Sequence, residues 1–391
     1  MSTRSSSSNA GDHQSAVAPG VDEQWMARAL ALASRGAALA HPNPTVGAVL
    51  VKNGRAIGEG FHQYNRLDHA EIVALKNAGA NAPGATLYVT LEPCCTTGRT
   101  APCTDAVIDA GVKRVVAAMQ DPNPAVAGRG LAKIRRAGIE VRSGVGESEA
   151  RRLNEGFAKW IRTGFPFVTL KTALTLDGQI ASHKGSTTWV TSEASREAVQ
   201  RLRHESDALL TGIGTVLVDN PRMSDRTGKP RRRPLLRAIV DSHLRMPLKS
   251  ELVKSAQGDV IVFTTQSHDS IKARALERAG IDVVRVPARR GRVDLESVLR
   301  DLGNRQFLNV ILEAGAALNG AALEAGIVDK MILFYAPKIM GTGGVPMAGI
   351  SSSWFPKSPA LQDLRVYSCG ADFVVEGYFN VYGYHRARRN G

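Results

Sequence analysis

Cysteine is scarce in this sequence, and long apolar runs are missing from it. Only four cysteines occur among 391 residues, and three of them, Cys94, Cys95 and Cys103, lie close together. This distribution argues against a disulfide framework and indicates metal binding in a reducing compartment, which predicts a cytoplasmic protein. No apolar run approaches the roughly 20 residues needed to cross a bilayer, so we expect no membrane-spanning helix.

The N-terminus is poor in hydrophobic residues. Residues 1–21 contain neither the apolar stretch of a signal peptide nor enough apolar side chains to be buried in a core. We therefore expect residues 1–21 to form a disordered tail that is neither a secretory signal nor a folded element.

Acidic residues are outnumbered, since 36 of them accompany 50 lysines and arginines and leave a formal net charge of +14. This excess fits either a nucleic-acid partner or phosphorylated small molecules, and we favour the second. The basic run Arg231-Arg232-Arg233 lies between two prolines with no aromatic residue interleaved, which predicts a solvated loop. An RNA-editing deaminase with a nucleic-acid-binding second domain stays as the alternative.

The chain is long enough for two globular domains, because single cores rarely grow past roughly 250 to 300 residues. Periodicity and turn residues predict a helix from residue 22 to about 36, a hairpin turning at Asn53-Gly54, strands over 85–91, 112–119 and 139–143, and a helix over 131–137. This alternation indicates a mixed α/β layer fold. We place a first domain at 22–146, a connecting helix at 147–163 and a second domain at 164–391.

One histidine and two cysteines could form an open metal site. His69, Cys94 and Cys103 offer an imidazole and two thiolates, and three ligands leave the fourth tetrahedral position of a zinc ion for water. Glu71 follows the histidine by two residues and could carry the proton of that water. His-x-Glu followed by Pro-Cys and a further cysteine is the pattern of zinc deaminases.

Two structural interpretations compete with catalysis at these residues. Asp68 suits the N-cap of a helix, so Glu71, three positions later, could be a capping-box residue. Cys95 could complete a closed zinc site as a fourth ligand, in a protein without catalytic activity. Cys103 precedes a predicted helix, whose N-terminus would favour its thiolate.

The second half contains predicted strands that end in glycine-containing turns. We expect strands over 167–174, over 208–211 before Gly212-x-Gly214, and over 310–312 before Glu313-Ala314-Gly315 and a helix. A helix N-terminus after such a turn can hold a phosphate through free backbone amides. Leu217 takes the place of the third glycine of a Rossmann fingerprint, so a tight turn explains Gly212 and Gly214 equally well.

Several motifs together resemble one family, the bifunctional deaminase/reductase of riboflavin biosynthesis. They are Pro42–Gly47, His69–Glu71, Glu92–Cys94, Gly98–Cys103 and Lys171–Gly178. The eight residues between Cys94 and Cys103 distinguish this family from cytidine and tRNA adenosine deaminases, which have Pro-Cys-x-x-Cys. The chain departs from the family at Cys95-Thr96-Thr97, where a histidine is usual, and at Ala101, which replaces a proline.

The resemblance implies a cytidine-deaminase-like three-layer α/β/α domain followed by a dihydrofolate-reductase-like α/β domain. It implies one zinc ion per chain, NADPH, phosphorylated pyrimidine substrates and a homo-oligomer, either a dimer or a tetramer. The first reaction would be hydrolytic deamination of 2,5-diamino-6-(5-phosphoribosylamino)pyrimidin-4-one, with Glu71 as the proton shuttle. In the second, NADPH would reduce the ribosyl side chain of 5-amino-6-(5-phosphoribosylamino)uracil to ribityl.

The resemblance also assigns contacts in both domains. Substrate contacts fall on Asn43, Thr187, Arg203, Met223, Arg226 and Glu313, of which the two arginines suit a phosphate. NADPH contacts fall on Thr172, Trp189, Thr215, Asp219, Ser242 and the segment Gly315, Ala316, Ala317, Leu318, Asn319, Gly320 and Ala321. Lys171 could supply or orient a proton near the reduced carbon, or it could be a strand-edge charge.

Overall fold

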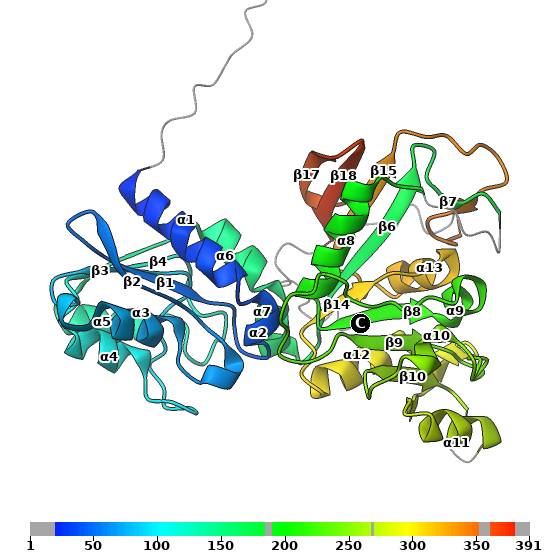
Figure 1. Ribbon diagram of the computed structural model, residues 1–391, viewed down its shortest axis with the longest axis horizontal. Coiled ribbons are helices and arrows are strands. Elements are labelled where there is room, and N and C mark those ends of the chain that lie inside the picture. The colour runs from blue at the N-terminus through cyan, green and yellow to red at the C-terminus, as the bar shows by residue number, and fades with distance from the viewer. Residues whose placement is uncertain (1–19, 184–189, 267–269, 352–359, 380–391) are drawn as a thin grey trace, which may run out of the picture.

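Two separate sheets organise the chain in the computed structural model, which describes residues 20–183, 190–266, 270–351 and 360–379. The first sheet has five strands and lies on the left of Figure 1, in blue to teal. The second has nine strands and lies on the right, in green to red. Each sheet has its own buried apolar clusters, so the chain contains two cores, as its length predicts.

The first sheet has the strand order β2-β1-β3-β4-β5 and mixes both strand directions. Its strands are β1 (Gly47–Lys52), β2 (Arg55–Phe61), β3 (Thr86–Val89), β4 (Arg114–Ala117) and β5 (Glu140–Ser143). The predicted hairpin joins β1 and β2, and both Asn53 and Gly54 have positive φ angles, 52° and 69°. Because β3, β4 and β5 run parallel, their carboxyl ends meet at one edge of the sheet.

Helices cover both faces of this sheet, which confirms the expected three-layer domain (Figure 1). The helices α1 (Val21–Ser34) and α6 (Glu147–Leu153) cover one face, and α3 (Ala70–Ala78), α4 (Cys103–Asp109) and α5 (Arg129–Arg136) cover the other. Glycine is required where helices and strands approach most closely. A Cβ atom at Gly47 would lie 2.1 Å from the carbonyl oxygen of Ala29 in α1, and one at Gly58 would lie 2.2 Å from that of Ala74 in α3.

The connection between the domains differs from the single helix predicted over 147–163. It consists of α6 and a second helix, α7 (Glu155–Thr163), separated at Asn154. The Asn154 side chain accepts a hydrogen bond from the amide of Thr45 at 2.8 Å and donates one to its carbonyl oxygen at 3.1 Å. The break therefore fixes the chain just before β1, a contact that no local sequence pattern reveals.

The second sheet has the order β11-β10-β9-β8-β14-β6-β15-β18-β17, in which the strands from β11 to β15 run parallel. These parallel strands are β6 (Phe167–Thr175), β8 (Ala208–Gly212), β9 (Leu236–Val240), β10 (Val260–Thr264), β11 (Asp282–Arg285), β14 (Asn309–Leu312) and β15 (Lys330–Ala336). The strands β17 (Gln362–Cys369) and β18 (Asp372–Tyr378) continue the sheet in antiparallel fashion. The expected strands of the second half are thus confirmed.

The helices of the second domain are α8 (Glu193–Glu205), α9 (Ile213–Asp219), α10 (Glu251–Lys254), α11 (Ile271–Arg278), α12 (Leu295–Asn304) and α13 (Ala316–Glu324). Two short ladders pair β7 (Gln179–Ala181) with β16 (Val345–Pro346) and β12 (Ala288–Arg289) with β13 (Arg292–Val293). The central strands of the sheet are buried on both faces, as is usual for parallel strands. In the part of the chain that is described, no helix is long and apolar enough to cross a membrane.

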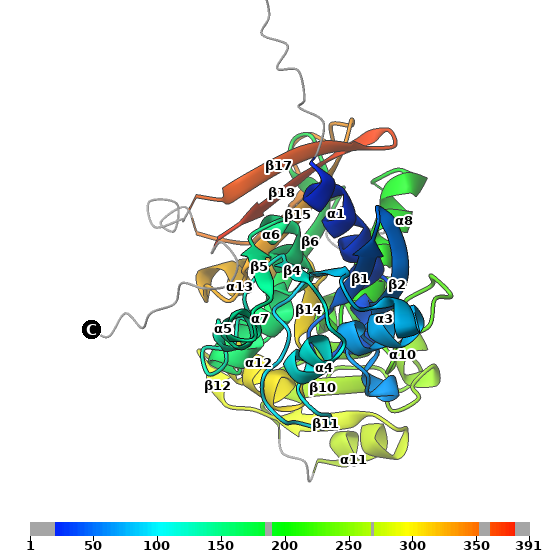
Figure 2. The ribbon, with the colours of Figure 1, turned by 90° about the vertical axis from the view of Figure 1, so that its left-hand side faces the viewer.

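The two domains meet through polar contacts around the short helix α2 (Ala37–Ala40), which lies between the two lobes in Figure 1. His41 follows α2, and its Nδ1 lies 2.9 Å from a carboxylate oxygen of Asp207, with both side chains buried. The other oxygen of Asp207 accepts hydrogen bonds from the amides of Leu308 and Asn309. The start of the second sheet is thereby tied to the loop that precedes β1. In Figure 2 the first domain faces the viewer.

The basic run at 231–233 is not the solvated loop that its composition predicts. Arg231 is half-buried and donates hydrogen bonds to the backbone carbonyl oxygens of Arg203, His204 and Ser206. The backbone amide of Arg232 donates to the carbonyl oxygen of Ala38 in α2, at 2.9 Å. These arginines therefore belong to the junction between the domains.

Candidate active sites

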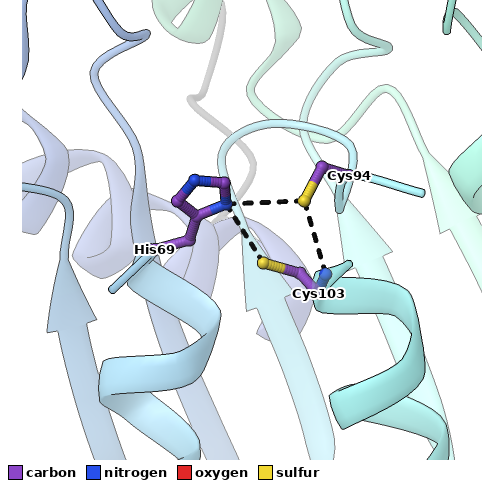
Figure 3. Close-up of side chains that lie close together, drawn as sticks. All are labelled: His69, Cys94 and Cys103. Carbon is purple, nitrogen blue, oxygen red and sulfur yellow. Dashed lines mark hydrogen bonds between the residues drawn. The ribbon is translucent and has the colours of Figure 1, made fainter. Parts of the chain in front are cut away.

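Three separate elements bring His69, Cys94 and Cys103 together. The histidine immediately precedes α3, Cys94 follows β3, and Cys103 is the first residue of α4. His69 Nδ1 lies 3.2 Å from the Cys103 sulfur and 3.5 Å from the Cys94 sulfur, and all three ligand atoms lie within 4.8 Å of one another. Figure 3 shows both sulfur atoms turned towards the imidazole ring. The structure thus collects the three residues that the sequence predicts as ligands.

The start of α3 differs by one residue from the prediction. Asp68 is not the N-cap; His69 occupies that position in an extended conformation, and the Asp68 carboxylate pairs with Lys76 at 2.6 Å. Glu71 is consequently the second helical residue and does not hold the third position that a capping-box glutamate needs. Its side chain is only 3% exposed and lies beside Cys103, and burial raises its pKa to about 7.

Glu92 holds the loop that carries Cys94. Its buried carboxylate accepts hydrogen bonds from the backbone amides of Asp121, Gly128, Gly130 and Leu131, at 2.7–3.1 Å. Two of these amides belong to the first turn of α5, where unpaired donors favour a negative charge. The glutamate of the Glu-Pro-Cys motif therefore has a positioning role that the sequence did not reveal.

The residues present fit a zinc ion. Hydrogen bonds from the Cys103 thiol, from His69 and from the Cys103 amide lower the pKa of Cys94 to about 4, so one thiolate forms readily. The hydrogen bond from the Cys103 thiol to the Cys94 thiolate raises the pKa of Cys103, and burial raises it further. A divalent cation between the two sulfurs would remove the repulsion between two thiolates, and one imidazole with two thiolates is a donor set that zinc prefers. Among the described residues Cys95 does not join the cluster, which leaves the closed four-ligand interpretation without support.

A second histidine, which the sequence did not single out, lies beside the cluster. The His62 ring meets the His69 ring edge to face, with centroids 5.2 Å apart. His62 Nδ1 donates to the Asp68 carbonyl oxygen at 2.9 Å, so Nε2 is free to accept a hydrogen bond from the Asn43 amide at 3.0 Å. Burial lowers the pKa of His62, which keeps this ring neutral. Asn43, an expected substrate contact, is therefore held next to the metal-ligand cluster.

The loop that departs from the family pattern is exposed to solvent. Thr96 and Thr97 are both exposed, as are Gly98 and Arg99. The imidazole that lies beside the cluster is that of His62. This residue directly follows the hairpin strand β2 and does not belong to the exposed loop. A signal for it existed in the sequence, since His62 lies only seven positions before His69.

A half-buried triad of ion-paired side chains, Lys171, Arg203 and Glu313, marks the second domain. The Lys171 ammonium lies 3.1 Å from a carboxylate oxygen of Glu313, and Arg203 Nε and Nη2 lie 2.7 and 3.0 Å from the same carboxylate. Leu170 of β6 is level with Leu312 of β14, so Lys171 and Glu313 follow at neighbouring positions of the sheet. The two cations lower the pKa of Glu313 to about 2 although burial opposes ionisation. Lys171 is thus a half-buried, paired cation.

The predicted substrate contacts of the second domain lie in different surroundings. The Arg203 fork is used by Glu313, and its Nη1 donates to the carbonyl oxygen of Ser224. Met223 is buried with a positive φ of 55°, and Arg226 is exposed. Thr187 and Trp189 lie outside the described residues. The predicted pairing of Arg203 with a phosphate would therefore have to compete with Glu313.

The predicted NADPH contacts cluster where parallel strands end. Thr172 is buried in β6, and its hydroxyl has no hydrogen-bond partner among the described residues. Ser242 follows β9, and its hydroxyl accepts a hydrogen bond from the Val293 amide. Thr215 and Asp219 belong to α9, where Asp219 is exposed. The segment 315–321 lies at the start of α13, where Asn319 is fully buried and donates hydrogen bonds to the carbonyl oxygens of Ala314 and Met347. Ligands of open α/β sheets bind at this carboxyl edge.

Known proteins share both halves of the chain. Residues 19–119 match the cytidine and deoxycytidylate deaminase zinc-binding region, and residues 166–375 match the RibD C-terminal domain. The riboflavin biosynthesis protein RibD of Aquifex aeolicus is 41% identical over 91% of this chain and 98% of its own length. That of Escherichia coli is 45% identical over 82% of this chain and 89% of its own length.

Solved structures agree with these matches. RibD of Acinetobacter baumannii superposes with a TM-score of 0.80 at 37% identity, covering 92% of this chain and 98% of the other. A diaminohydroxyphosphoribosylaminopyrimidine deaminase/5-amino-6-(5-phosphoribosylamino)uracil reductase from Thermotoga maritima gives the same values. The expected cytidine-deaminase-like and dihydrofolate-reductase-like domains are confirmed. With this identity along nearly its whole length, the chain belongs to the RibD family of bifunctional riboflavin biosynthesis enzymes.

Proposed function

We propose that the two activities of the RibD family divide between the two sites of this chain. Deamination of 2,5-diamino-6-(5-phosphoribosylamino)pyrimidin-4-one takes place at His69, Cys94 and Cys103, and reduction takes place at the carboxyl edge of the second sheet. The observation that carries the proposal is the three-ligand cluster, with ligand atoms within 4.8 Å and a buried carboxylate beside it. Three protein ligands are the number found in catalytic zinc sites.

In the deaminase site the zinc ligands are His69, Cys94 and Cys103. Zinc, when bound there, lowers the pKa of a water molecule and so supplies a nucleophile near neutral pH. Glu71 lies beside Cys103 and takes a proton from that water. It returns the proton to the amino nitrogen, which leaves as ammonia while the ring carbon keeps the oxygen. Asn43, held by neutral His62, orients the pyrimidine through its side-chain amide.

In the reductase site the chain must hold NADPH and the open-chain sugar in line. NADPH supplies the hydride that converts the ribosyl carbon C1 to the ribityl form. Two buried hydroxyls without partners among the described residues, those of Thr172 and Thr211, are the kind of groups that a bound ligand would satisfy. The amides at the start of α13, after Gly315, suit a phosphate. Lys171, oriented by Glu313, is the candidate proton donor to the reduced centre.

The proposed domain boundaries are 22–146 for the deaminase and 164–391 for the reductase, with 147–163 connecting them. In support, α6 contacts α1 of the first domain, and α7 contacts β6 and β14 of the second. The helix α1 begins at Val21, one residue before the proposed boundary. The tail before it lies almost entirely outside the described residues. We propose a cytoplasmic location, because thiol ligands for zinc persist best in a reducing compartment.

A homo-oligomer, either a dimer or a tetramer, is the proposed assembly. The edge strand β17 supports it, because Leu364, Val366 and Tyr367 are 58%, 62% and 43% exposed on a strand whose outer edge pairs with no other strand among the described residues. Apolar, unpaired edges favour association with another chain. Light scattering of the purified chain should give a multiple of the 41.8 kDa chain mass. A monomer at micromolar concentration would contradict this proposal.

The proposed function is tested by assaying the purified chain with the diaminopyrimidine substrate, with and without NADPH, alongside a metal analysis. We expect one zinc per chain, release of ammonia without NADPH, and NADPH oxidation only when the substrate or its deaminated product is present. A chain that contains zinc but releases no ammonia would refute the deaminase assignment. A chain that oxidises NADPH with neither pyrimidine would refute the reductase assignment.

A further inference from the structure

Arginines from both domains lie over the ring of one tyrosine, Tyr64. The guanidinium carbon of Arg99, from the Gly-Arg-Thr loop of the first domain, lies 4.5 Å from the centroid of the Tyr64 ring. The guanidinium carbon of Arg232, from the basic run of the second domain, lies 3.9 Å from the same centroid. The two groups are therefore separated by no more than the sum of these distances, although they are far apart in the sequence.

The backbone around Arg232 is held firmly, while its side chain has unused hydrogen-bonding capacity. Its amide is bonded to Ala38 of α2, and α2 also contacts the short 3-10 helix that begins at Tyr64. Its neighbours Arg231 and Arg233 use their side chains on backbone carbonyl oxygens of the second domain. Arg232 Nη1, like Nε of Arg233, is buried without a hydrogen-bond partner among the described residues, but Arg233 has the Asp207 carboxylate nearby, at 3.9 Å. A buried charged donor without an acceptor is costly, and a ligand oxygen would relieve that cost.

The charge at this ring is also unbalanced. In the regions that the structure describes, no carboxylate forms an ion pair with Arg99 or Arg232. Two like charges over one ring repel each other unless an anion lies near them. Most other buried or half-buried arginines here are paired, as Arg203 is with Glu313 and Arg237 with Asp259 at 2.6 Å. The pair of arginines on Tyr64 therefore has the properties of an anion site.

This anion site adjoins the deaminase cluster. Tyr64 follows His62 by two residues, and the His62 ring contacts the His69 ring. Arg99 also lies on the loop that joins the ligands Cys94 and Cys103. In the proposed function Asn43 orients the pyrimidine beside the metal ligands, so the ribosyl phosphate at the other end of the substrate needs a binding site farther from them.

We propose that Arg232, together with Arg99, binds the phosphate of the pyrimidine nucleotide in the deaminase site, so that the second domain supplies a substrate-binding residue to the first. A phosphate monoester matches this chemistry because a guanidinium binds its oxygens in pairs. The inference rests on the proposed deaminase function. It also explains why the reductase domain docks its basic run against α2 instead of exposing it to solvent.

The test uses the full-length chain with Arg232→Met, which keeps an apolar stem over Tyr64 but removes the charge. Deamination is measured with the phosphorylated substrate and with its counterpart lacking the phosphate. We expect KM for the phosphorylated substrate to rise roughly tenfold to a hundredfold, with kcat changed less than about twofold. Catalytic efficiency towards the compound without phosphate should stay within about twofold of wild type. Arg233→Met, from the same run, is the matched control and should change neither ratio.

Zinc content and reductase activity, measured on the same preparations, separate loss of binding from loss of folding. If Arg232→Met does not fold, Arg232→Lys replaces it, and it should raise KM selectively for the phosphorylated substrate by a smaller factor. Equal losses on both substrates would mean a purely structural contact between domains and would overturn the inference while leaving the deaminase assignment intact. A wild-type chain that deaminates neither compound would overturn the proposed function as well.

Discussion

The two sites of this chain differ in how their charged groups are neutralised. In the first domain, two thiols, an imidazole and the buried Glu71 crowd together, and a bound metal ion would balance the negative charge of ionised thiolates there. In the second domain, Lys171 and Arg203 both pair with Glu313, so each of these charged groups already has a partner within the protein, with one positive charge in excess. The first site therefore depends on what it binds, whereas the second is preorganised by its own residues.

Removing a metal ligand should have the largest effect on one site and none on the other. Cys103→Ser should lower zinc below one equivalent per chain and reduce ammonia release by more than a thousandfold, because the water then loses its activation. The reductase half, which uses no metal, should keep wild-type activity with the deaminated product. Metal analysis and the two assays measure this on one preparation. Full zinc content in the variant would refute the ligand set.

A smaller but more selective effect is expected from Glu71→Gln. The amide keeps the volume of the side chain but cannot take a proton from water, so deamination should fall by roughly 10²–10⁴-fold. Zinc content should remain at the wild-type level, since Glu71 is not a ligand. Ammonia release and metal analysis check both statements. A variant that keeps more than a tenth of wild-type activity would return Glu71 to a structural role.

In the second domain the corresponding change is Glu313→Gln, which leaves the half-buried Lys171 and Arg203 without their shared carboxylate. Breaking a fully buried ion pair from one side typically costs about 3–5 kcal/mol of stability, so this half-buried triad should lose up to that much, and the second domain should unfold at lower denaturant concentration. Reductase activity should fall, while ammonia release by the intact first domain persists. Denaturant unfolding followed by both assays measures this, and an unchanged midpoint would contradict the ion pairs described for the triad.

The same carboxylate predicts a pH dependence. The pKa of Glu313 is lowered from 4.5 to about 2, so the folded protein binds a proton here less readily than the unfolded chain. Its stabilising contribution is therefore complete above pH 4.5 and is lost as the pH falls towards 2. The difference in unfolding free energy between wild type and Glu313→Gln should shrink over this range by about 3 kcal/mol. A constant difference between pH 5 and pH 3 would contradict the lowered pKa.

The sequence revealed the first site better than the second because its chemistry is carried by rare residues. Few arrangements of His69, Cys94 and Cys103 satisfy a zinc deaminase pattern, and the three residues do come together. The helix that follows His69 was predicted too, although its N-cap is His69 and not Asp68. A shift of the N-cap by one residue moves Glu71 from the third helical position, where a capping glutamate lies, to the second, where it is buried. Sequence patterns do not locate the end of a helix to within one residue.

What the sequence did not reveal depends on contacts between distant segments. Asn154 interrupts the expected connecting helix because its side chain binds the backbone at Thr45. The basic run at 231–233 is drawn into the junction because carbonyl oxygens of α8 and α2 lie beside it. The partner of Lys171 was hidden for the same reason, since Glu313 is brought level with it only by the pairing of β6 and β14. Local patterns contain no information about such partners.

The central claim is that deamination and reduction occur at separate sites in a fixed order. NADPH oxidation by the Glu71→Gln chain tests it most directly, with the diaminopyrimidine and its deaminated product supplied in turn. We predict no oxidation above background with the diaminopyrimidine and a wild-type rate with the deaminated product. Oxidation at comparable rates with both compounds, or with neither, would contradict the account.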